Sequence, residues 1–357
     1  MARIWTVKQM TAVANTGSRC ASVPPADKPL KKRLPVVLGI RGRILPIVLC
    51  AAAVLLLGAS YPGLGRLVYD NDSLYHRIFV YRSGAVVTLQ FGRRDPMLVQ
   101  SQVDLRNLRR HMVEYTTLAF CGLLYNQEPS KVLILGLGGG VIPREMRHYF
   151  PEMEIDVAEI DPAILPVAER FFSFRTDDKL QVHITDGRMF VRSLLRKDPV
   201  PRYDMVILDA FTSDYIPFHL MTREFIEEVK GVLADGGVVV ANVFSSNKLF
   251  DAEFRTFDEV FGRCDAFVGA SSGNAMLVSP GPGVPAFKAQ ELSERAAALQ
   301  TKHLFAFDLR QVAARFRPGL QPDPRAKVLT DDRAPVNWLR TQPTEMLQGE
   351  LVHPAQH

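Results

Sequence analysis

Cysteine is scarce in this sequence, with four among 357 residues. Cys20, Cys50, Cys121 and Cys264 are scattered, form no CxxC pair and have no histidine nearby at ligand spacing. A disulfide framework needs paired cysteines, and a structural zinc site needs clustered ligands. The sequence therefore predicts free thiols in the core or tail, and we expect no bound metal.

The body of the chain also lacks an excess of positive charge. The formal net charge is +5, but residues 1–43 hold nine Lys/Arg and a single acid, Asp27. That segment is therefore +8, which leaves −3 for residues 44–357. A nucleic-acid-binding domain normally presents a basic face. We expect no nucleic-acid partner, and we interpret residues 1–33 as a disordered basic tail.

A full-length apolar span is missing too. The uncharged run 44–58 is shorter than the roughly 20 residues of a membrane-spanning helix. Residues 34–61 are long enough, but Arg41 and Arg43 interrupt them. We favour a single-pass anchor in the cell membrane, with the arginines reaching toward the interface. A cleaved export signal ending near Gly58-Ala59-Ser60 and a buried soluble helix are the alternatives.

The charge bias would place the N-terminus in the cytoplasm and send the main domain across the membrane. A domain that uses a cytoplasmic nucleoside fits that location poorly. The side of the membrane on which the main domain lies is therefore left open.

Residues 66–127 have the pattern of a small β module followed by a connecting helix. Residues 77–81 and 85–90 are rich in β-branched and aromatic residues, and Ser83-Gly84 between them is a turn signal. Residues 105–125 carry apolar residues at helical spacing. We expect an antiparallel hairpin and one helix here.

Residues 128–280 alternate short apolar runs with helical patterns. This alternation predicts a parallel sheet with helices on both faces, an α/β fold of Rossmann-like type. Residues 266–269 and 275–279 are expected to form an antiparallel pair at its edge, and residues 281–357 a mixed C-terminal extension. The predicted strands are 132–135, 154–160, 180–184, 203–208 and 237–243, and the predicted helices are 141–149, 163–171, 188–195 and 222–233.

A glycine cluster and a carboxylate follow the first two strands. Gly136, Gly138 and Gly140 would let the backbone turn sharply and approach a ligand, although a tight strand-to-helix turn explains them as well. Glu159 comes about 20 residues later, where a carboxylate can bind ribose hydroxyls. Alone, Glu159 could equally be a surface charge or a helix cap.

Two more acids follow later strands. Asp186-Gly187 could contact an adenine amino group or merely cap the next helix. Asp209 ends the fourth strand, and ligands of such sheets bind outside the carboxyl ends of the strands. A carboxylate there can orient an amine and accept its proton. The alternative is an acid in a solvated loop.

These motifs, in this order, resemble the spermidine synthase (polyamine aminopropyltransferase) family over roughly residues 70–280. The matching stretches are KVLILGLGGGVIPREM, IDVAEIDPAI, VAERFF, VHITDGRMFV, YDMVILDAF and PFHLMTREF. Asp209-Ala210-Phe211 and the later LTDDRAPV are similar to the divergent, membrane-linked branch. The resemblance implies a sheet of the S-adenosylmethionine-dependent methyltransferase type, preceded by the small β module.

The resemblance also implies the chemistry, which is transfer of an aminopropyl group from decarboxylated S-adenosylmethionine to an amine such as putrescine. Asp209 would be the catalytic acid/base. The glycines would shape the turn at the co-substrate, Glu159 would hold its ribose, and Asp186 with Gly187 its adenine. Gln100, Tyr115 and Asp214 would bind the amine. A homodimer is a further expectation, separate from the resemblance.

The sequence departs from the family where an amine would bind. Gly139 stands where the family carries an aspartate, Tyr115-Thr116-Thr117 where it has Tyr-His-Glu, and Asp214 is displaced in spacing. A dication needs carboxylates to offset its desolvation. Two alternatives therefore stay open, a methyltransferase that uses S-adenosylmethionine and a non-catalytic nucleoside- or polyamine-binding membrane protein. A dehydrogenase fits poorly, since Pro143 disrupts the GxGxxG spacing.

Overall fold

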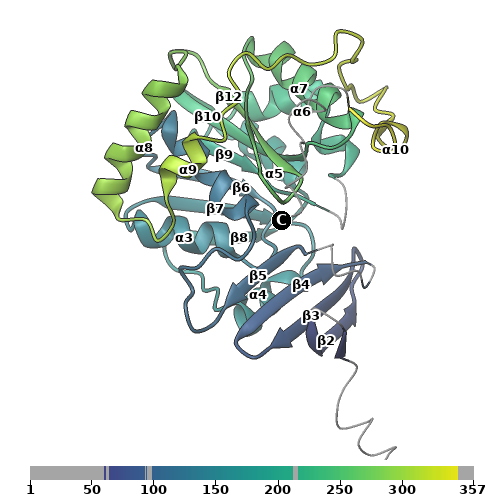
Figure 1. Cartoon of the computed structure of the whole chain (residues 1–357). Coiled ribbons are helices and arrows are strands. Elements are labelled where there is room, and N and C mark those ends of the chain that lie inside the picture. The colour runs from purple at the N-terminus through teal and green to yellow at the C-terminus, as the bar shows by residue number, and fades with distance from the viewer. Residues whose placement is uncertain (1–59, 62–63, 93, 95–98, 212–215, 345–357) are drawn as a thin grey trace, which may run out of the picture. The chain divides into compact units, whose positions relative to one another are not determined.

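The computed structural model describes residues 60–61, 64–92, 94, 99–211 and 216–344. These residues belong to one compact unit (Figure 1). The predicted basic tail and nearly all of the predicted membrane segment lie outside the described residues, as does Asp214. Within the described ranges, no helix is long and apolar enough to cross a bilayer.

The N-terminal part of the described chain is an antiparallel sheet of five strands in sequential order. The predicted hairpin is present, since β3 and β4 pair from Ile78 opposite Phe91 to Ser83 opposite Val86. The flanking strands were not predicted. The strands are β1 (Ser60–Tyr61), β2 (Gly65–Asp72), β3 (Arg77–Ser83), β4 (Val86–Phe91) and β5 (Ser101–Asp104).

The main sheet has seven strands in the order β11-β12-β10-β9-β6-β7-β8. The five strands from β10 to β8 are parallel, and β12 and β11 add an antiparallel edge, as the sequence predicts. The strands are β6 (Lys131–Leu135), β7 (Glu154–Glu159), β8 (Leu180–Ile184), β9 (Tyr203–Leu208), β10 (Leu233–Phe244), β11 (Asp265–Val268) and β12 (Asn274–Pro280).

Both faces of this sheet are buried, which explains its continuous apolar strands. In β6, Val132 and Ile134 join one hydrophobic cluster, while Leu133 and Leu135 join another. Apolar side chains of α3 and α4 pack in the first cluster, and those of α5, α6 and α7 in the second. The helices are α3 (Val141–Tyr149), α4 (Ile164–Phe171), α5 (Gly187–Leu195), α6 (Arg223–Lys230) and α7 (Lys248–Phe261).

The prediction of one long helix over residues 105–125 is wrong. Residues 105–114 form turns, and the helical part is limited to α2 (Tyr115–Leu118) and the 3-10 helix η1 (Ala119–Leu124). The carboxylate of Asp104 accepts hydrogen bonds from the backbone N–H and guanidinium of Arg106, and the N–H of Asn107 bonds to the carbonyl of Asp104. Such local side-chain bonds compete with helix formation.

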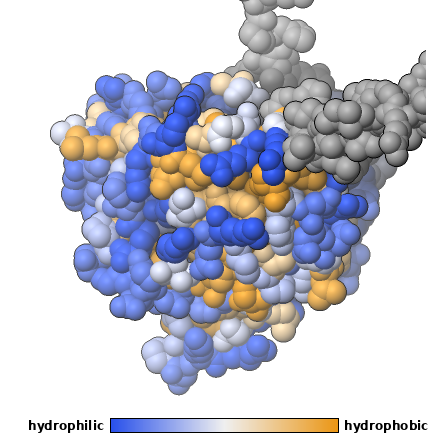
Figure 2. Space-filling view, turned by 90° about the horizontal axis from the view of Figure 1, so that it is seen from below, coloured by the Kyte–Doolittle hydropathy of each residue, from blue (hydrophilic) through white to orange (hydrophobic). Residues whose placement is uncertain are grey.

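The C-terminal extension contains a helix that the sequence analysis did not predict. In α8 (Ala289–His303), Leu292, Ala296 and Leu299 are buried at the spacing of one helical face. α9 (Leu309–Ala313) and α10 (Val336–Leu339) follow. Figure 1 shows α8 and α9 covering one flank of the sheet. In the face seen in Figure 2, apolar residues form several patches separated by polar ones.

The small sheet is held against the glycine turn of the main sheet. The N–H of Gly139 donates a hydrogen bond to Oγ of Ser101 in β5 at 2.9 Å. Beyond the turn, Arg109 reaches the fully buried Glu145 of α3, with 3.2 Å between Nη1 and Oε2. These contacts place β5 above the carboxyl ends of the parallel strands, where a ligand of such a fold binds.

Candidate active site

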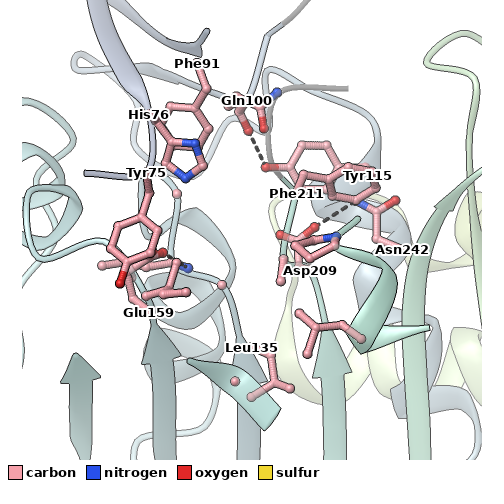
Figure 3. Close-up of a pocket in the computed structure, with 18 of the residues that line it drawn as sticks. Tyr75, His76, Phe91, Gln100, Tyr115, Leu135, Glu159, Asp209, Phe211 and Asn242 are labelled. Atoms are coloured by element: carbon pink, nitrogen blue, oxygen red, sulfur yellow. Dashed lines mark hydrogen bonds between the residues drawn. The ribbon is translucent and has the colours of Figure 1, made fainter. Parts of the chain in front are cut away.

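A cavity of about 570 Å³ opens at the carboxyl ends of β6, β7 and β9. In Figure 3, Glu159 lies on one side, Asp209 on the other, and Leu135 beneath and between them. Gly140 does not line the cavity. Eight of the ten residues that the sequence predicts for the site line it: Gln100, Tyr115, Gly136, Gly138, Glu159, Asp186, Gly187 and Asp209.

The glycine turn forms the floor near β6. Gly136 has a φ of +101°, and a Cβ there would lie 2.3 Å from the carbonyl oxygen of Asp209. A side chain at this position would therefore be strained and would clash with backbone. Gly140, with a φ of +69°, precedes α3 and packs against Phe174. Its role in this structure is to turn the chain into the helix.

Glu159 ends β7 and is 7% exposed. The N–H of Leu137 donates to its Oε2, and the N–H of Asp161 donates to its Oε1, both at 2.9 Å. Burial raises the pKa of Glu159, and these backbone bonds offset part of the rise. The carboxylate is thus fixed in position beside the glycine turn, where it can accept hydrogen bonds from vicinal hydroxyls of a sugar.

Asp186 has two contacts at the start of α5. Its Oδ1 accepts a bond from the N–H of Met189 at 2.9 Å, which is a helix N-cap. Its Oδ2 lies 2.9 Å from Nε2 of His219, in the 3-10 helix η2 (Phe218–Leu220). The bond from His219 lowers the pKa of Asp186, against the effect of burial. The capping role is therefore present, and the side chain also lines the cavity.

Asp209 lies in a network of amide side chains. Nδ2 of Asn242, in β10, donates to Oδ1 of Asp209 at 2.8 Å. Nδ2 of Asn274, at the start of β12, donates to Oδ1 of Asn242 at 2.9 Å. Burial raises the pKa of Asp209 to about 7, and the bond from Asn242 offsets part of that rise. An acid with this pKa can accept a proton near neutral pH.

Tyr115 and Gln100 close the cavity above Asp209. The hydroxyl of Tyr115 donates to the backbone carbonyl of Gln100 at 2.7 Å (Figure 3). Burial raises the pKa of Tyr115, and the charge of Asp209 adds to the rise. The phenol is therefore neutral across the physiological range. It presents an aromatic wall next to the carboxylate.

The small β sheet contributes an aromatic wall near Glu159. His76 stacks on Phe91 with ring centroids 4.4 Å apart and planes 7° from parallel. Tyr75 stands beside them and lines the cavity (Figure 3). Burial lowers the pKa of His76, against the charge of Asp161. A neutral, flat surface of this kind suits contact with a nucleoside base.

The structure explains the glycine at position 139. A Cβ there would lie 2.8 Å from both the ring of Phe172 and Cβ of Ser101. Gly139 itself does not line the cavity, whereas Gly138 does. Ser101 and Phe172 therefore occupy the space into which a side chain at position 139 would point.

Several side chains that line the cavity escaped the sequence analysis: His76, His219, Asn242 and Asn274. Asn242 had a usable signal, since a lone amide within the apolar run 238–243 is out of place in a strand buried on both faces. The others come from segments whose approach to the site depends on tertiary structure. Over the residues that the structure describes, no three His, Cys, Asp or Glu side chains converge as a metal site would require.

Comparisons with known proteins agree with this geometry. Residues 112–268 match the spermine/spermidine synthase domain. The polyamine aminopropyltransferase of Vibrio vulnificus is 35% identical over 300 residues, covering 83% of this chain and 99% of that protein. The mouse eEF1A lysine and N-terminal methyltransferase is 35% identical over 123 residues, 33% of this chain and 18% of that protein.

A solved structure shows the same fold. The probable spermidine synthase of Corynebacterium glutamicum superposes with a TM-score of 0.55 at 19% identity, covering 75% of this chain and 99% of that one. The described part of the chain is thus a Rossmann-like α/β protein preceded by an antiparallel β module. Given the near-complete match to the Vibrio protein, it belongs to the spermine/spermidine synthase family, and the predicted resemblance is confirmed.

Proposed function

We propose that this protein transfers an aminopropyl group from decarboxylated S-adenosylmethionine to an amine such as putrescine. One observation carries the proposal. Glu159 and Asp209 line the same cavity, on opposite sides of the glycine turn, in a chain that aligns with 99% of a polyamine aminopropyltransferase. We infer that the first acid accepts hydrogen bonds from a sugar and that the second binds an amine. We call the two sides the Glu159 wall and the Asp209 wall.

The Glu159 wall would bind the donor nucleoside. It comprises the glycine turn, Glu159, Asp186 and the stacked His76. Glu159 would accept hydrogen bonds from the ribose hydroxyls, and the Asp186 carboxylate from the adenine amino group. The aromatic surface of His76 would exclude water from the nucleoside. These residues hold the donor in place, and positioning supplies much of the acceleration in a displacement reaction.

The Asp209 wall would bind the amine and accept its proton. The neutral amine nitrogen attacks the carbon next to the sulfonium, a C–N bond forms, and the C–S bond breaks to release a neutral thioether. The positive charge passes from sulfur to nitrogen, and one proton then leaves the nitrogen for the Asp209 carboxylate. An acid with a pKa of about 7 is suited to this step near neutral pH.

A methyltransferase is the second candidate, and one observation favours it. Gly139 provides no carboxylate for an aminopropyl ammonium, and the space a side chain would enter is filled by Ser101 and Phe172. The partial match to a methyltransferase is consistent with this alternative. S-adenosylmethionine would then replace its decarboxylated form as donor.

Mass spectrometry of the products distinguishes the candidates. The purified full-length chain is incubated with each donor and a panel of mono-, di- and triamines. We expect an aminopropylated amine that requires the decarboxylated donor. Methylated products formed with S-adenosylmethionine would contradict the proposal and support the second candidate. Tight binding of either donor without any product would indicate a non-catalytic binding protein.

We further propose that residues 34–61 anchor the protein in the cell membrane by a single pass. The proposal rests on the apolar composition of this segment and its basic flank. Fractionation of cells that express the full chain or residues 62–357 tests it. The full chain should sediment with membranes and resist extraction by salt or alkali, and the shorter chain should not. The homodimer stays a prediction, which sedimentation of the purified protein would test.

A further inference from the structure

Glu114 lies outside the cavity but makes an unusually complete set of hydrogen bonds to one turn. Its Oε1 accepts from the N–H of Ala270 at 2.7 Å. Its Oε2 accepts from the N–H and hydroxyl of Ser271, at 2.8 and 2.9 Å, and from the N–H of Ser272 at 3.0 Å. Glu114 directly precedes α2 and lies more than 150 residues before this turn in the sequence. This contact therefore joins two distant segments of the fold.

The physical character of this contact makes it strong. Three successive backbone N–H groups converge on one carboxylate, which is the arrangement of an anion-binding nest. Hydrogen bonds to an ionised acceptor are stronger than neutral ones. The bonds from the turn lower the pKa of Glu114 despite its burial. The carboxylate is therefore charged near neutral pH, when the contact is strongest.

The turn that Glu114 holds connects β11 to β12 and leads directly to the Asp209 wall. Ser271 and Ser272 line the cavity. Asn274 follows within two residues and donates to Asn242, which in turn donates to Asp209. A shift of the turn would therefore be transmitted to the side-chain amide that contacts the catalytic carboxylate.

Glu114 also adjoins the other part of that wall. The next residue is Tyr115, whose hydroxyl holds the carbonyl of Gln100. One carboxylate thus fixes the β11–β12 turn relative to the segment that carries Tyr115, and residues of both line the cavity on the Asp209 side. In Figure 3, Tyr115 and Asn242 both approach Asp209 from the side opposite Glu159.

We propose that Glu114 is a positioning residue for the amine side of the site, acting through the 270–272 turn, Asn274 and Asn242 on the orientation of Asp209. The reaction named in this proposal rests on the proposed function, but the contact chain does not. Its effect can therefore be measured on Asp209 itself, without substrate and without turnover.

The titration of Asp209 is the direct readout. Asn242 donates to it from β10, and the aromatic Tyr115 faces it from α2. Glu159, from β7, is the acid across the cavity. Loss of the Asn242 bond should raise the pKa of Asp209 by about one unit, since a hydrogen bond to a carboxylate favours its charged form. Loosening the turn should produce part of the same rise.

The test compares Glu114→Ala with Asp265→Asn in the full-length protein, with Asn242→Leu as the reference for complete loss. Asp265 is a matched control because its side chain is 19% exposed against 18% for Glu114. It begins β11 at the end remote from the turn and accepts a bond from Tyr125. The Asp209 carboxyl is followed by ¹³C NMR from pH 5 to 9, and its signal is assigned by its loss in Asp209→Asn.

We expect Glu114→Ala to raise the pKa of Asp209 by about half the shift seen in Asn242→Leu, and Asp265→Asn to leave it unchanged. The double variant Glu114→Ala/Asn274→Ala should shift the pKa of Asp209 no more than the larger of the two single substitutions, because both act through the same series of contacts. An unchanged titration in folded Glu114→Ala, or equal shifts in the control, would overturn the proposal. If Glu114→Ala does not fold, Glu114→Gln retains the bonds to one oxygen and should show a smaller shift.

Kinetics then tests the consequence for substrate. Glu114→Ala should raise the KM for the amine about tenfold and leave the KM for the donor within about twofold, because the Glu159 wall is not disturbed. An equal rise in both would argue for a general loss of structure and against the proposal. If the wild-type protein forms no aminopropylated product, the proposed function fails, while the NMR titration still decides the role of Glu114.

Discussion

The two walls of the cavity are built in different ways. On the Glu159 wall, both acids accept bonds from backbone N–H groups of the same strand-to-helix unit or the next one: Glu159 binds the backbone of Asp161 and Leu137, and Asp186 binds the N–H of Met189. Asp186 also contacts the side chain of His219 from a distant segment. Asp209 itself is held by side-chain contacts between strands, from Asn242 in β10 and, through it, from Asn274 in β12. Backbone contacts thus fix the acids of the proposed nucleoside site, whereas the proposed amine site depends on the packing of three separate strands.

This difference implies a division of labour that substitutions can test. A change on the Glu159 wall should act mainly on donor binding, because those groups contact the unreactive part of the donor. A change on the Asp209 wall should act mainly on the KM for the amine, on kcat and on its pH dependence, because the carboxylate there would bind the amine and accept its proton. A Glu159-wall variant that mainly lowers kcat, or an Asp209-wall variant that mainly lowers donor affinity, would contradict this division.

The largest expected effect is that of Asp209→Asn. The amide keeps the size of the side chain but cannot accept a proton, so kcat should fall by about a thousandfold, within the usual range for general acid–base catalysis. Donor affinity, measured by calorimetry, should change by less than about twofold. Unaltered kcat would remove Asp209 from the catalytic role. A large loss of donor affinity would show that the two walls are not separable.

Glu159→Gln should have the next largest effect. Unlike Asp209→Asn, it should lower donor affinity much more than kcat. The amide can accept from only one of the two backbone N–H groups, and it loses the charge that favours bonds from ribose hydroxyls. Hydrogen bonds to a charged group contribute about 1.5–3 kcal/mol, so donor affinity should fall by roughly 10- to 100-fold. The kcat at saturating donor should fall by less than about threefold. A greater loss in kcat than in affinity would contradict the assignment.

The stability of the protein should record the burial of Asp209. Its pKa is raised from 3.8 to about 7, so folding favours the protonated acid. That contribution is fully present below about pH 4 and is lost as the pH rises through 7. Asp209→Asn has no carboxyl group to ionise at this position, so its stability does not fall in this way as the pH rises. It should be more stable than the wild type at pH 8 by about 1–2 kcal/mol, allowing for partial exposure of the site. Urea unfolding from pH 8 to pH 5 measures this difference, which should narrow on acidification.

Asn242→Leu is the control for this pH effect. It removes the hydrogen bond that favours the charged form of Asp209, so the stability should fall over a pH range that extends further upward than in the wild type. A difference between Asp209→Asn and wild type that is constant with pH would show that Asp209 does not titrate in this range.

Sequence reasoning predicted the glycine turn, Glu159 and Asp186 because their signals are local, but it missed His76 of the same wall and His219, which contacts Asp186. The alternation of apolar strands and helices places the glycine turn, Glu159 and Asp186 at one edge of the sheet, and the structure has β6, β7 and β8 where they were expected. Position along the chain is enough here, since the carboxyl ends of parallel strands meet at one edge.

The Asp209 wall was predicted only in part, for physical reasons. Asp209 and Tyr115 came from motif order, but the link from Asn274 through Asn242 to Asp209 needs the register of β10 with β12, where Asn242 pairs with Met276 and Phe244 with Asn274. No local pattern encodes that register. The failed helix over 105–125 has a different origin, because local turn bonds at Asp104 outweigh the apolar periodicity.

The smallest expected effect decides between the two roles that the sequence left open for Asp186. Alanine removes the N-cap of α5 and should cost about 1 kcal/mol in the free energy of unfolding. Asparagine can still accept from the N–H of Met189, so Asp186→Asn should lose less stability than Asp186→Ala and only through its weaker contact with His219. If the carboxylate also binds adenine, Asp186→Asn should weaken donor binding severalfold, more than this small loss of stability explains. Donor affinity equal to that of the wild type in Asp186→Asn would restrict Asp186 to the cap and leave recognition of the base to the rest of the Glu159 wall.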